Sequence, residues 1–500
     1  MNQGAGKPFR RVFLVAHSQY RYVLLALARR LHAQKNSKLH LYVTTPQEES
    51  FYRQNSEPGL FETIEIAFRL YDAVGAQDLD EAKVVAEARK NENWLGCTYN
   101  HINISDRHLG RGYALAGYHH PRSRYSEGTD YVQMLQAYNG LFAYWRNQFY
   151  LKQPSVIIQG GKVLAVIARS MGIPFRQIAG ARVQNYHYWA QDEYFETDEL
   201  DAAFASTSGD LDVAAAMDRP YLSHRTIRDA FLAKKRWRNL PKRLLLIVAR
   251  HIYWRLRRYE KARGYLLRER LVYELRLQRD LARYIGSHMP NLESLGDKPF
   301  VFFPLHTEPE MALQTLSPEY FYQHAAIAAI SRDLPAGYKL VVKDTPYSLG
   351  RRPSDFYDQI RDLKNVILLE TLEPGLDIVR RAKAVVTITG TAGFEAAALG
   401  KPVISFGRHN LFALLPHVWT VSDETRLKDY LAAALTAEFD TEKALRDGAR
   451  FLEAMIGMSF DLRGYDYIDL KSFDPEAVDE ATQALYRSFE SKPSVLARSG

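Results

Sequence analysis

The feature that most constrains this chain is an alternation of short apolar runs with helical patterns, which occurs in two separate stretches. In the first stretch, apolar β-rich runs occupy 11–16, 39–44, 64–68, 154–158 and 173–178, and helical spacing of apolar residues fills the segments between them. In the second, similar runs occupy 300–303, 338–343, 366–369, 384–388 and 402–406. Such alternation with short glycine-containing links produces a parallel sheet covered by helices on both faces. The sequence therefore predicts an α/β protein with two doubly wound domains.

A helical segment lies between the two stretches, and another follows the second stretch. Residues 225–290 have a long helical pattern dense in arginine and lysine, and residues 422–500 have the pattern of helices with a polar tail. A chain of 500 residues also exceeds what one hydrophobic core supports. We therefore expect an N-terminal domain over 1–200, a basic helical bridge over 201–296, a second α/β domain over 297–420 and C-terminal helices over 421–500.

Composition narrows the classes of partner and compartment. The formal net charge is +8, which suits nucleotide phosphates, anionic glycans or a lipid headgroup surface, whereas the aromatic-interleaved basic motifs of nucleic-acid modules are missing. The most apolar run, 244–250, is far shorter than the roughly 20 residues of a membrane-spanning helix. The N-terminus lacks the apolar segment of a secretory signal, so we expect a cytoplasmic protein. Cys97 is the single cysteine and has no neighbours at metal-ligand spacing.

The segment from Val385 to Val403 has the order strand, Gly-Thr turn, helix and strand, which suits phosphate binding. The expected donor-phosphate residues within it are Thr389, Gly390, Thr391, Ala392, Gly393 and Glu395. The two glycines allow close approach of the backbone to an anion, and a helix starting near Ala392 offers free N–H groups and the positive end of its dipole. Glu395, one turn into the helix, is suited to ribose or sugar hydroxyls. The alternative is that the glycines only permit tight turns; the flanking strands favour the phosphate site.

Two further loops follow strands of the same predicted sheet, and ligands of doubly wound sheets gather at the carboxyl ends of strands. The loop 304–310 carries His306, Glu308 and Glu310, and the loop 343–352 carries Lys343, Arg351 and Arg352. Taken singly, His306 is better explained as a surface or capped-loop histidine, and Arg351 with Arg352 as a solvated charge pair. Their convergence on one sheet edge favours a binding site.

These three motifs together resemble a known family. The segments Phe303-Pro-Leu-His-Thr-Glu-Pro-Glu, Leu340-Val-Val-Lys-Asp-Thr-Pro and Thr387-Ile-Thr-Gly-Thr-Ala-Gly-Phe-Glu, with Gly400-Lys-Pro-Val, are similar to the bacterial surface-polysaccharide (capsule) biosynthesis proteins, GT-B glycosyltransferases related to the β-Kdo transferases. The strong match covers about 300–410. The resemblance implies a GT-B-like fold, with two Rossmann-type domains facing a cleft, the donor nucleotide in the C-terminal domain and the acceptor in the N-terminal domain.

The chain departs from the resembled family at one position. Where the family has a His-Pro pair near the donor phosphate, this sequence has Thr345-Pro346. A threonine hydroxyl donates a hydrogen bond but carries no positive charge, so stabilisation of the leaving group is expected to shift to Lys343, Arg351 or His306.

Polar residues also follow strands of the N-terminal half. Transfer by inversion needs a carboxylate or an imidazole to take the proton of the acceptor hydroxyl, which makes Asp106 and His17 candidates. Expected acceptor-side residues are Arg107, Arg111 and Gln159. A capping Asp106 and a buried, hydrogen-bonded His17 are equally good structural explanations.

The basic stretch 232–280 alternates cations with aromatic and aliphatic residues, including Trp237, Leu244, Tyr253 and Leu256. Such a helix is suited to an anionic membrane surface, where lipid-linked acceptors are found. A solvated helical bridge is the simpler interpretation.

Together these patterns predict a glycosyltransferase that moves a sugar from a nucleotide-activated donor to a cell-surface glycan of capsule or lipopolysaccharide. We expect neither a cofactor nor a metal, because cationic side chains and a helix N-terminus can hold the leaving phosphate. Two alternatives stay open: transfer of an alcohol phosphate from a CDP-alcohol, as in teichoic-acid polymerases, and a non-catalytic glycan-assembly role on a degenerate scaffold.

Overall fold

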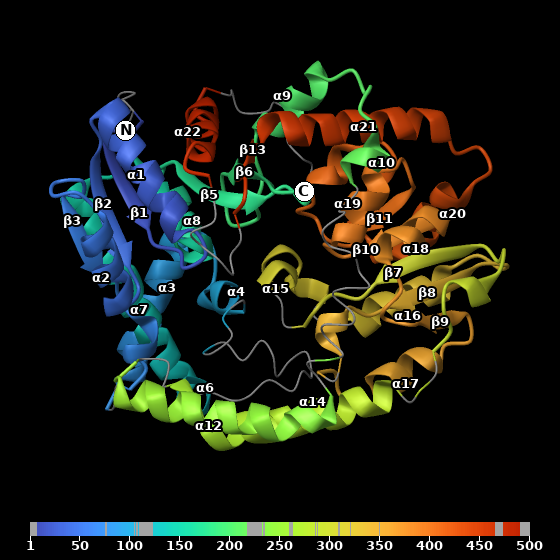
Figure 1. The fold of residues 1–500 in the computed structure, drawn as a ribbon, viewed down its shortest axis with the longest axis horizontal. Coiled ribbons are helices and arrows are strands. Elements are labelled where there is room, and N and C mark those ends of the chain that lie inside the picture. The colour runs from blue at the N-terminus through green and yellow to red at the C-terminus, as the bar shows by residue number, and fades with distance from the viewer. Residues whose placement is uncertain are drawn as a thin grey trace. The chain divides into compact units, whose positions relative to one another are not determined.

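The computed structural model describes residues 8–75, 78–104, 106, 109, 124–217, 233, 236–259, 264–285, 287, 289–308, 311–320, 322–349, 351–465 and 474–490. The chain forms two compact units (Figure 1). The first comprises residues 1–103, 128–207 and 454–499, and the second comprises 104–127 and 208–453. The predicted α/β class with two mainly parallel sheets is confirmed.

The first unit contains a seven-stranded sheet in the order β13-β6-β5-β4-β1-β2-β3. Strands β1 to β5 are parallel, and β6 and β13 are added antiparallel at one edge. The strands are β1 Arg11–Val15, β2 Lys38–Val43, β3 Thr63–Ile66, β4 Val156–Ile158, β5 Phe175–Gly180, β6 Tyr186–Ala190 and β13 Phe460–Asp461. The helices are α1 Arg21–Lys35, α2 Pro46–Asn55, α3 Glu81–Leu95, α4 Tyr99–Asn103, α7 Tyr131–Lys152, α8 Gly161–Met171, α9 Glu199–Ser206 and α22 Ala477–Arg487.

The last described helix completes the core of the first unit. Helix α22 packs against α1, so a helix from the last part of the chain lies beside one from the first part (Figure 1). Trp189 of β6 donates its indole N–H to the Ala481 carbonyl at 2.8 Å, and buried Arg176 of β5 donates to the Ser488 carbonyl at 2.6 Å. These bonds to the main chain fix the C-terminal helix on the sheet.

The second unit contains a six-stranded, wholly parallel sheet in the order β12-β11-β10-β7-β8-β9. The strands are β7 Phe300–Pro304, β8 Lys339–Lys343, β9 Val366–Leu369, β10 Ala384–Thr387, β11 Val403–Ser405 and β12 Val418–Thr420. The helices are α6 Arg124–Glu127, α10 Val213–Ala216, α12 Leu240–Leu256, α14 Leu267–Ile285, α15 Met311–Leu316, α16 Gln323–Asp333, α17 Phe356–Arg361, α18 Gly375–Arg381, α19 Thr391–Ala398, α20 Leu427–Leu435 and α21 Thr441–Met458. The central strands are buried on both faces, as their continuous apolar sequences predict.

The observed units differ from the predicted boundaries at the C-terminus. Residues 421–500 divide between the two units, with α20 on the second unit and β13 and α22 on the first. Of the predicted basic bridge, 201–207 belong to the first unit and 208–296 to the second, where α12 and α14 pack as a helical pair. No helix among the described residues is long and apolar enough to cross a bilayer.

Candidate functional site

Three loops meet at the carboxyl edge of the second sheet, because they follow three adjacent strands. Strand β7 lies between β10 and β8, with Pro304 paired to Lys343 and Val385 paired to Phe302. The loops after these strands hold His306, Lys343 to Thr345, and Thr389 to Thr391. The structure therefore brings together the loops that the sequence predicted to converge.

The start of α19 presents free backbone donors. Gly390 precedes the helix in an extended conformation, and its own N–H donates to Thr387 Oγ1 at 3.0 Å. The N–H groups of Gly393 and Phe394 turn back to the Gly390 carbonyl at 3.2 and 3.4 Å. Within the described part of the chain, the N–H groups of Thr391 and Ala392 make no hydrogen bond. Both donors lie at the positive end of the helix dipole, which is the arrangement that binds phosphate.

The two glycines of this turn have different roles. A Cβ on Gly390 would stand 3.1 Å from Thr387 Oγ1 and 3.3 Å from His306 Nε2. Gly390 therefore lies beside the loop that carries His306. A Cβ on Gly393 would stand 2.5 Å from Thr387 Cγ2 and 3.0 Å from the Phe412 ring. Gly393 is buried and allows close packing of helix on strand. Packing against Thr387 and Phe412 thus accounts for a glycine at this position, and its expected contact with an anion stays a prediction.

His306 is held rigidly by neighbouring groups. Gln323, which is fully buried, accepts from the His306 N–H at 2.7 Å and donates to the His306 carbonyl at 3.1 Å. The ring Nε2 accepts from the Thr389 N–H at 3.0 Å. A nitrogen that accepts an N–H carries no proton, so the neutral ring has its proton on Nδ1. The expected role of His306 as a positive charge would require breaking this bond.

A buried cluster of charged side chains contacts the loops that follow β7 and β8. The Arg352 guanidinium, 2% exposed, donates to both oxygens of Asp344 at 2.9 Å and to Glu308 at 2.8 Å. It also donates to the His306 carbonyl at 2.5 Å. Tyr357 donates to Asp344 at 2.8 Å. Burial raises the pKa of Glu308, while the Arg352 charge opposes that rise. Arg352 is thus fully engaged, and the expectation that it neutralises a phosphate is wrong.

Lys343 is the predicted cation whose surroundings best suit the site. Its ammonium donates to the Thr371 carbonyl at 3.2 Å and the Asp344 carbonyl at 3.4 Å. Burial lowers the pKa of Lys343 to about 8, against the opposing attraction of Asp344, Glu373 and Glu395. The electrostatic interaction places Glu395 near Lys343, although the two residues come from different elements.

The remaining predicted residues of this unit have lesser roles. Thr345 is partly exposed and its hydroxyl accepts from the Tyr347 N–H at 3.4 Å, capping a short turn of 3₁₀ helix. Arg351 is partly exposed, and Glu310 lies outside the described residues.

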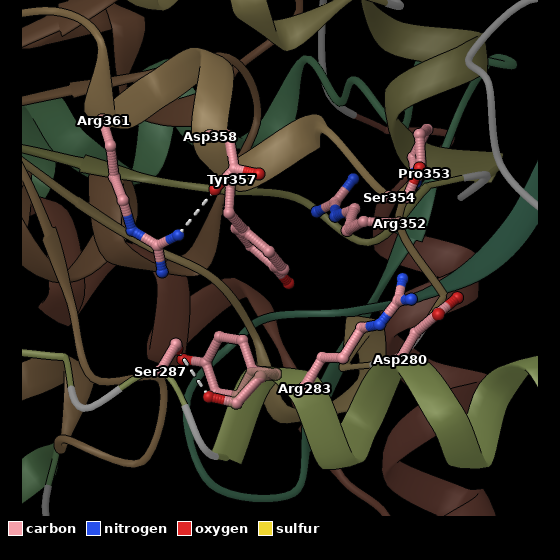
Figure 2. Close-up of a pocket in the computed structure, with 10 residues that line it drawn as sticks. Asp280, Arg283, Ser287, Arg352, Pro353, Ser354, Tyr357, Asp358 and Arg361 are labelled. Carbon is pink, nitrogen blue, oxygen red and sulfur yellow. Dashed lines mark hydrogen bonds and ion pairs between the residues drawn. The ribbon is translucent and has the colours of Figure 1, made fainter.

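A cavity of about 370 Å³ lies between α14 and α17, beside the buried cluster (Figure 2). Its walls are Asp280, Arg283, Tyr284, Ser287, Arg352, Pro353, Ser354, Tyr357, Asp358 and Arg361. Several of its charged groups are already paired: Arg361 with Asp358 at 2.9 Å and Asp280 with Arg279 at 2.8 Å. No residue of 389–395 lines this cavity, so it is separate from the start of α19.

The predicted residues of the N-terminal half fall in different units. His17 follows β1 and is exposed, with its ring 5.2 Å from that of Tyr20. Gln159 follows β4, is 4% exposed and adopts a left-handed backbone with φ of 67°. Asp106 belongs to the second unit and accepts from the Leu109 N–H at 2.7 Å. Arg107 and Arg111 lie outside the described residues.

The chain contains two Asp-Leu-Asp triplets, at 78–80 and 210–212. Asp80 caps α3 and Asp212 caps α10, each accepting a backbone N–H three residues on. Among the described residues, no group of three or more histidine, cysteine or acidic side chains is arranged to hold a metal.

Sequence reasoning missed Gln323 and Tyr357, which the structure places in the supporting network. Gln323 lies in an ordinary helical segment, and its sequence context carries no signal. Asp344 was visible in the Lys-Asp-Thr-Pro motif, but its burial against Arg352 was not.

The fold and the helix start at the carboxyl edge define a doubly wound α/β protein whose ligands are expected at that edge. Residues 253–445 match the family model described as capsule polysaccharide biosynthesis protein. Over these residues the chain is similar to that family, which confirms the resemblance drawn from the three motifs.

Several solved structures are similar to the chain. The KpsC β-Kdo 2,7 transferase of Thermosulfurimonas dismutans is 14% identical, with 69% of this chain and 89% of that chain covered and a TM-score of 0.31. The β-Kdo 2,4 transferase of the same protein is 15% identical, with 59% and 78% covered and a TM-score of 0.29. The spinosyn rhamnosyltransferase SpnG is 13% identical, with 89% and 98% covered and a TM-score of 0.28. No curated protein matches the chain.

Proposed function

We propose that this protein is a glycosyltransferase that moves a sugar from a nucleotide-activated donor to a cell-surface glycan. The observation that carries the proposal is the pair of free N–H groups at Thr391 and Ala392, which lie within the residues matched by the capsule family. Phosphates bind at such helix starts because the donors and the helix dipole act on the same anion.

In this proposal the donor pyrophosphate contacts the start of α19. Charge develops on the departing phosphate, and the Lys343 ammonium and the helix N-terminus stabilise it without a metal ion. Glu395 accepts from ribose or sugar hydroxyls. His306, through its Nδ1–H, Thr345 and Arg351 are the other donors proposed for the phosphate side.

The acceptor is proposed to bind to residues of the N-terminal half. His17 and Asp106 are the proposed bases for the acceptor hydroxyl, with Gln159, Arg107 and Arg111 as acceptor-side contacts. The place of action is proposed to be the inner face of the cytoplasmic membrane, where glycans on lipid carriers are extended.

The test of the phosphate site removes one N–H from the start of α19. Thr391→Pro does so with little cost to folding, because proline is favoured at the first helical position and Gly390 has the extended backbone that precedes proline. We expect this variant to bind nucleotide about 10- to 100-fold more weakly, since hydrogen bonds to charged groups contribute about 1.5–3 kcal/mol. Affinity is measured by calorimetry with the CMP, UDP, GDP or dTDP compound that a thermal-shift screen selects.

Three matched variants make this test specific. Thr391→Ala removes only the hydroxyl and should bind more tightly than Thr391→Pro. Glu81→Pro introduces proline at the first position of α3 and should leave affinity unchanged. Glu395→Ala should weaken binding about tenfold if one charge-assisted bond is lost. Unchanged affinity of folded Thr391→Pro would exclude the start of α19 as the phosphate site.

Product analysis separates the sugar transferase from its alternatives. Incubation with nucleotide-sugars should yield a glycosidic product with a glycan acceptor. A phosphodiester product from a CDP-alcohol, or nucleotide binding without turnover of any donor, would contradict the proposal.

A further inference from the structure

Helix α12 is fixed to the second unit by one of its faces. It runs antiparallel to α14, because Arg243 near its start pairs with Glu274 at 2.5 Å and donates to Gln278, while Trp254 near its end contacts the Tyr265 ring at 5.5 Å. Both helices lie along the same edge of their unit in Figure 1. The inward face of α12 is therefore already occupied.

The outward face of α12 is apolar, although solvent-facing helix surfaces are usually polar. Its exposed side chains are Leu245 (69%), Leu246 (51%), Ile252 (51%), Tyr253 (48%) and Leu256 (79%). Their spacing of one, seven, eight and eleven residues from Leu245 places them on a single stripe of the helix. Nothing among the described residues covers this stripe, which is the arrangement expected of a contact surface.

Cations lie within and beside the stripe, and α12 itself contains no acidic residue. Lys242, Arg250, Arg255 and Arg257 are exposed along or just after the helix. The sequence contains no aspartate or glutamate between 236 and 259. A second copy docking through the same surface would set these cations against each other, and like charges disfavour that contact. An anionic surface is complementary to both the apolar stripe and the charges.

We infer that the outward face of α12 docks on an anionic lipid bilayer. In this position the helix lies in the plane of the membrane, with its leucines at the boundary of the acyl chains and its arginines and lysine among the lipid phosphates. Tyr253 and the exposed Trp237 suit the headgroup level, where aromatic side chains with a polar end are enriched. This inference is independent of the proposed sugar transfer, because it depends only on α12.

The experiment is co-sedimentation of the full chain with vesicles. Vesicles of phosphatidylcholine alone are compared with vesicles that also contain phosphatidylglycerol, at low and high salt. We expect pelleting only with the anionic vesicles and less of it at high salt, since the surface potential is screened. Equal pelleting with both kinds of vesicle, or with neither, would overturn the inference.

Variants assign the binding to this surface. Two double variants replace exposed side chains of α12 and should preserve the fold. One combines Leu246→Gln with Leu256→Gln, and the other combines Arg250→Glu with Arg255→Glu. We expect each charge lost to weaken binding about fivefold and charge reversal to abolish pelleting. Leu445→Gln and Arg89→Glu are controls on exposed positions of other helices and should pellet like the parent.

Sedimentation velocity tests the competing occupant. A parent chain that is dimeric in solution, and that becomes monomeric with Leu246→Gln and Leu256→Gln, would show that α12 joins two copies and would overturn the membrane assignment. The membrane assignment is supported if parent and variant have the same association state and only the parent binds lipid.

Discussion

The backbone N–H of Thr389 donates to Nε2 of His306 across 3.0 Å, so a residue after β10 and a residue after β7 are joined at the base of the proposed phosphate site. The bond fixes both the ring orientation and the position of its proton. It also provides the buried N–H of Thr389 with an acceptor, and a buried backbone N–H without one would cost free energy of folding.

We predict that His306 is neutral and protonated on Nδ1. In a ¹⁵N-labelled sample, the Nε2 signal should have the chemical shift of an unprotonated ring nitrogen at neutral pH. His306→Ala leaves the Thr389 N–H without this acceptor, so the free energy of unfolding should fall by about 1–3 kcal/mol, and turnover should fall as well. A protonated Nε2 in the spectrum would contradict the assignment.

Alanine at the two glycines of the phosphate turn should separate packing from binding. Gly393→Ala forces a Cβ to 2.5 Å from Thr387 Cγ2, and overpacking of this kind costs about 1–3 kcal/mol of stability. Gly390→Ala meets its neighbours at 3.1 Å or more, so we expect a nearly normal midpoint in urea but weaker nucleotide binding. The reverse pattern would show that the roles are exchanged.

Loss of Arg352 should destabilise the second unit strongly. Arg352→Gln leaves the carboxylates of Glu308 and Asp344 buried without their cation, which typically costs about 3–5 kcal/mol. Arg361→Ala breaks an exposed ion pair with Asp358 and should cost at most about 1 kcal/mol. Denaturant unfolding of the two variants compares them directly, and equal costs would refute the buried cluster as a structural support.

The pKa of Lys343 near 8, below its ordinary value of 10.5, predicts a dependence of stability on pH. Between about pH 8 and 10.5 the unfolded chain binds the proton that the folded chain has lost, so this residue's contribution to stability rises with pH. Lys343→Met should remove that rise, as seen in the difference between parent and variant unfolding free energies across the window. Lys162, which burial also brings to a pKa of about 8, provides a matched substitution away from the site.

Loss of the Lys343 proton should weaken ligand binding, although it raises this residue's contribution to stability. Because the ammonium attracts phosphate, nucleotide affinity should fall as the pH rises through about 8 in the parent. Lys343→Arg should retain binding to higher pH, whereas Lys162→Met should follow the parent curve. A parent affinity independent of pH would remove Lys343 from the phosphate site.

Local pattern was sufficient to predict strands β1 to β5 and β7 to β11 and the turn at 389–391, because continuous apolar runs and glycine-containing turns act within a few residues. It was insufficient for β6, β12 and β13, which were not predicted. Strand β13 has only two residues, and its pairing of Phe460 with His187 joins positions far apart in the chain. Such an edge strand exists only because the sheet is already present.

What the sequence by itself determined is therefore the α/β class, the convergence of three loops on one sheet edge, and the similarity of residues 253–445 to the capsule polysaccharide biosynthesis family. Tertiary structure decided which of the charged and polar residues remain available to a ligand. Arg351 and Arg352 are adjacent and identical in type, yet only Arg352 is buried, because Asp344 and Glu308 compensate its charge there. The outcome depends on desolvation and on partners distant in sequence, and neither is encoded in the residue type.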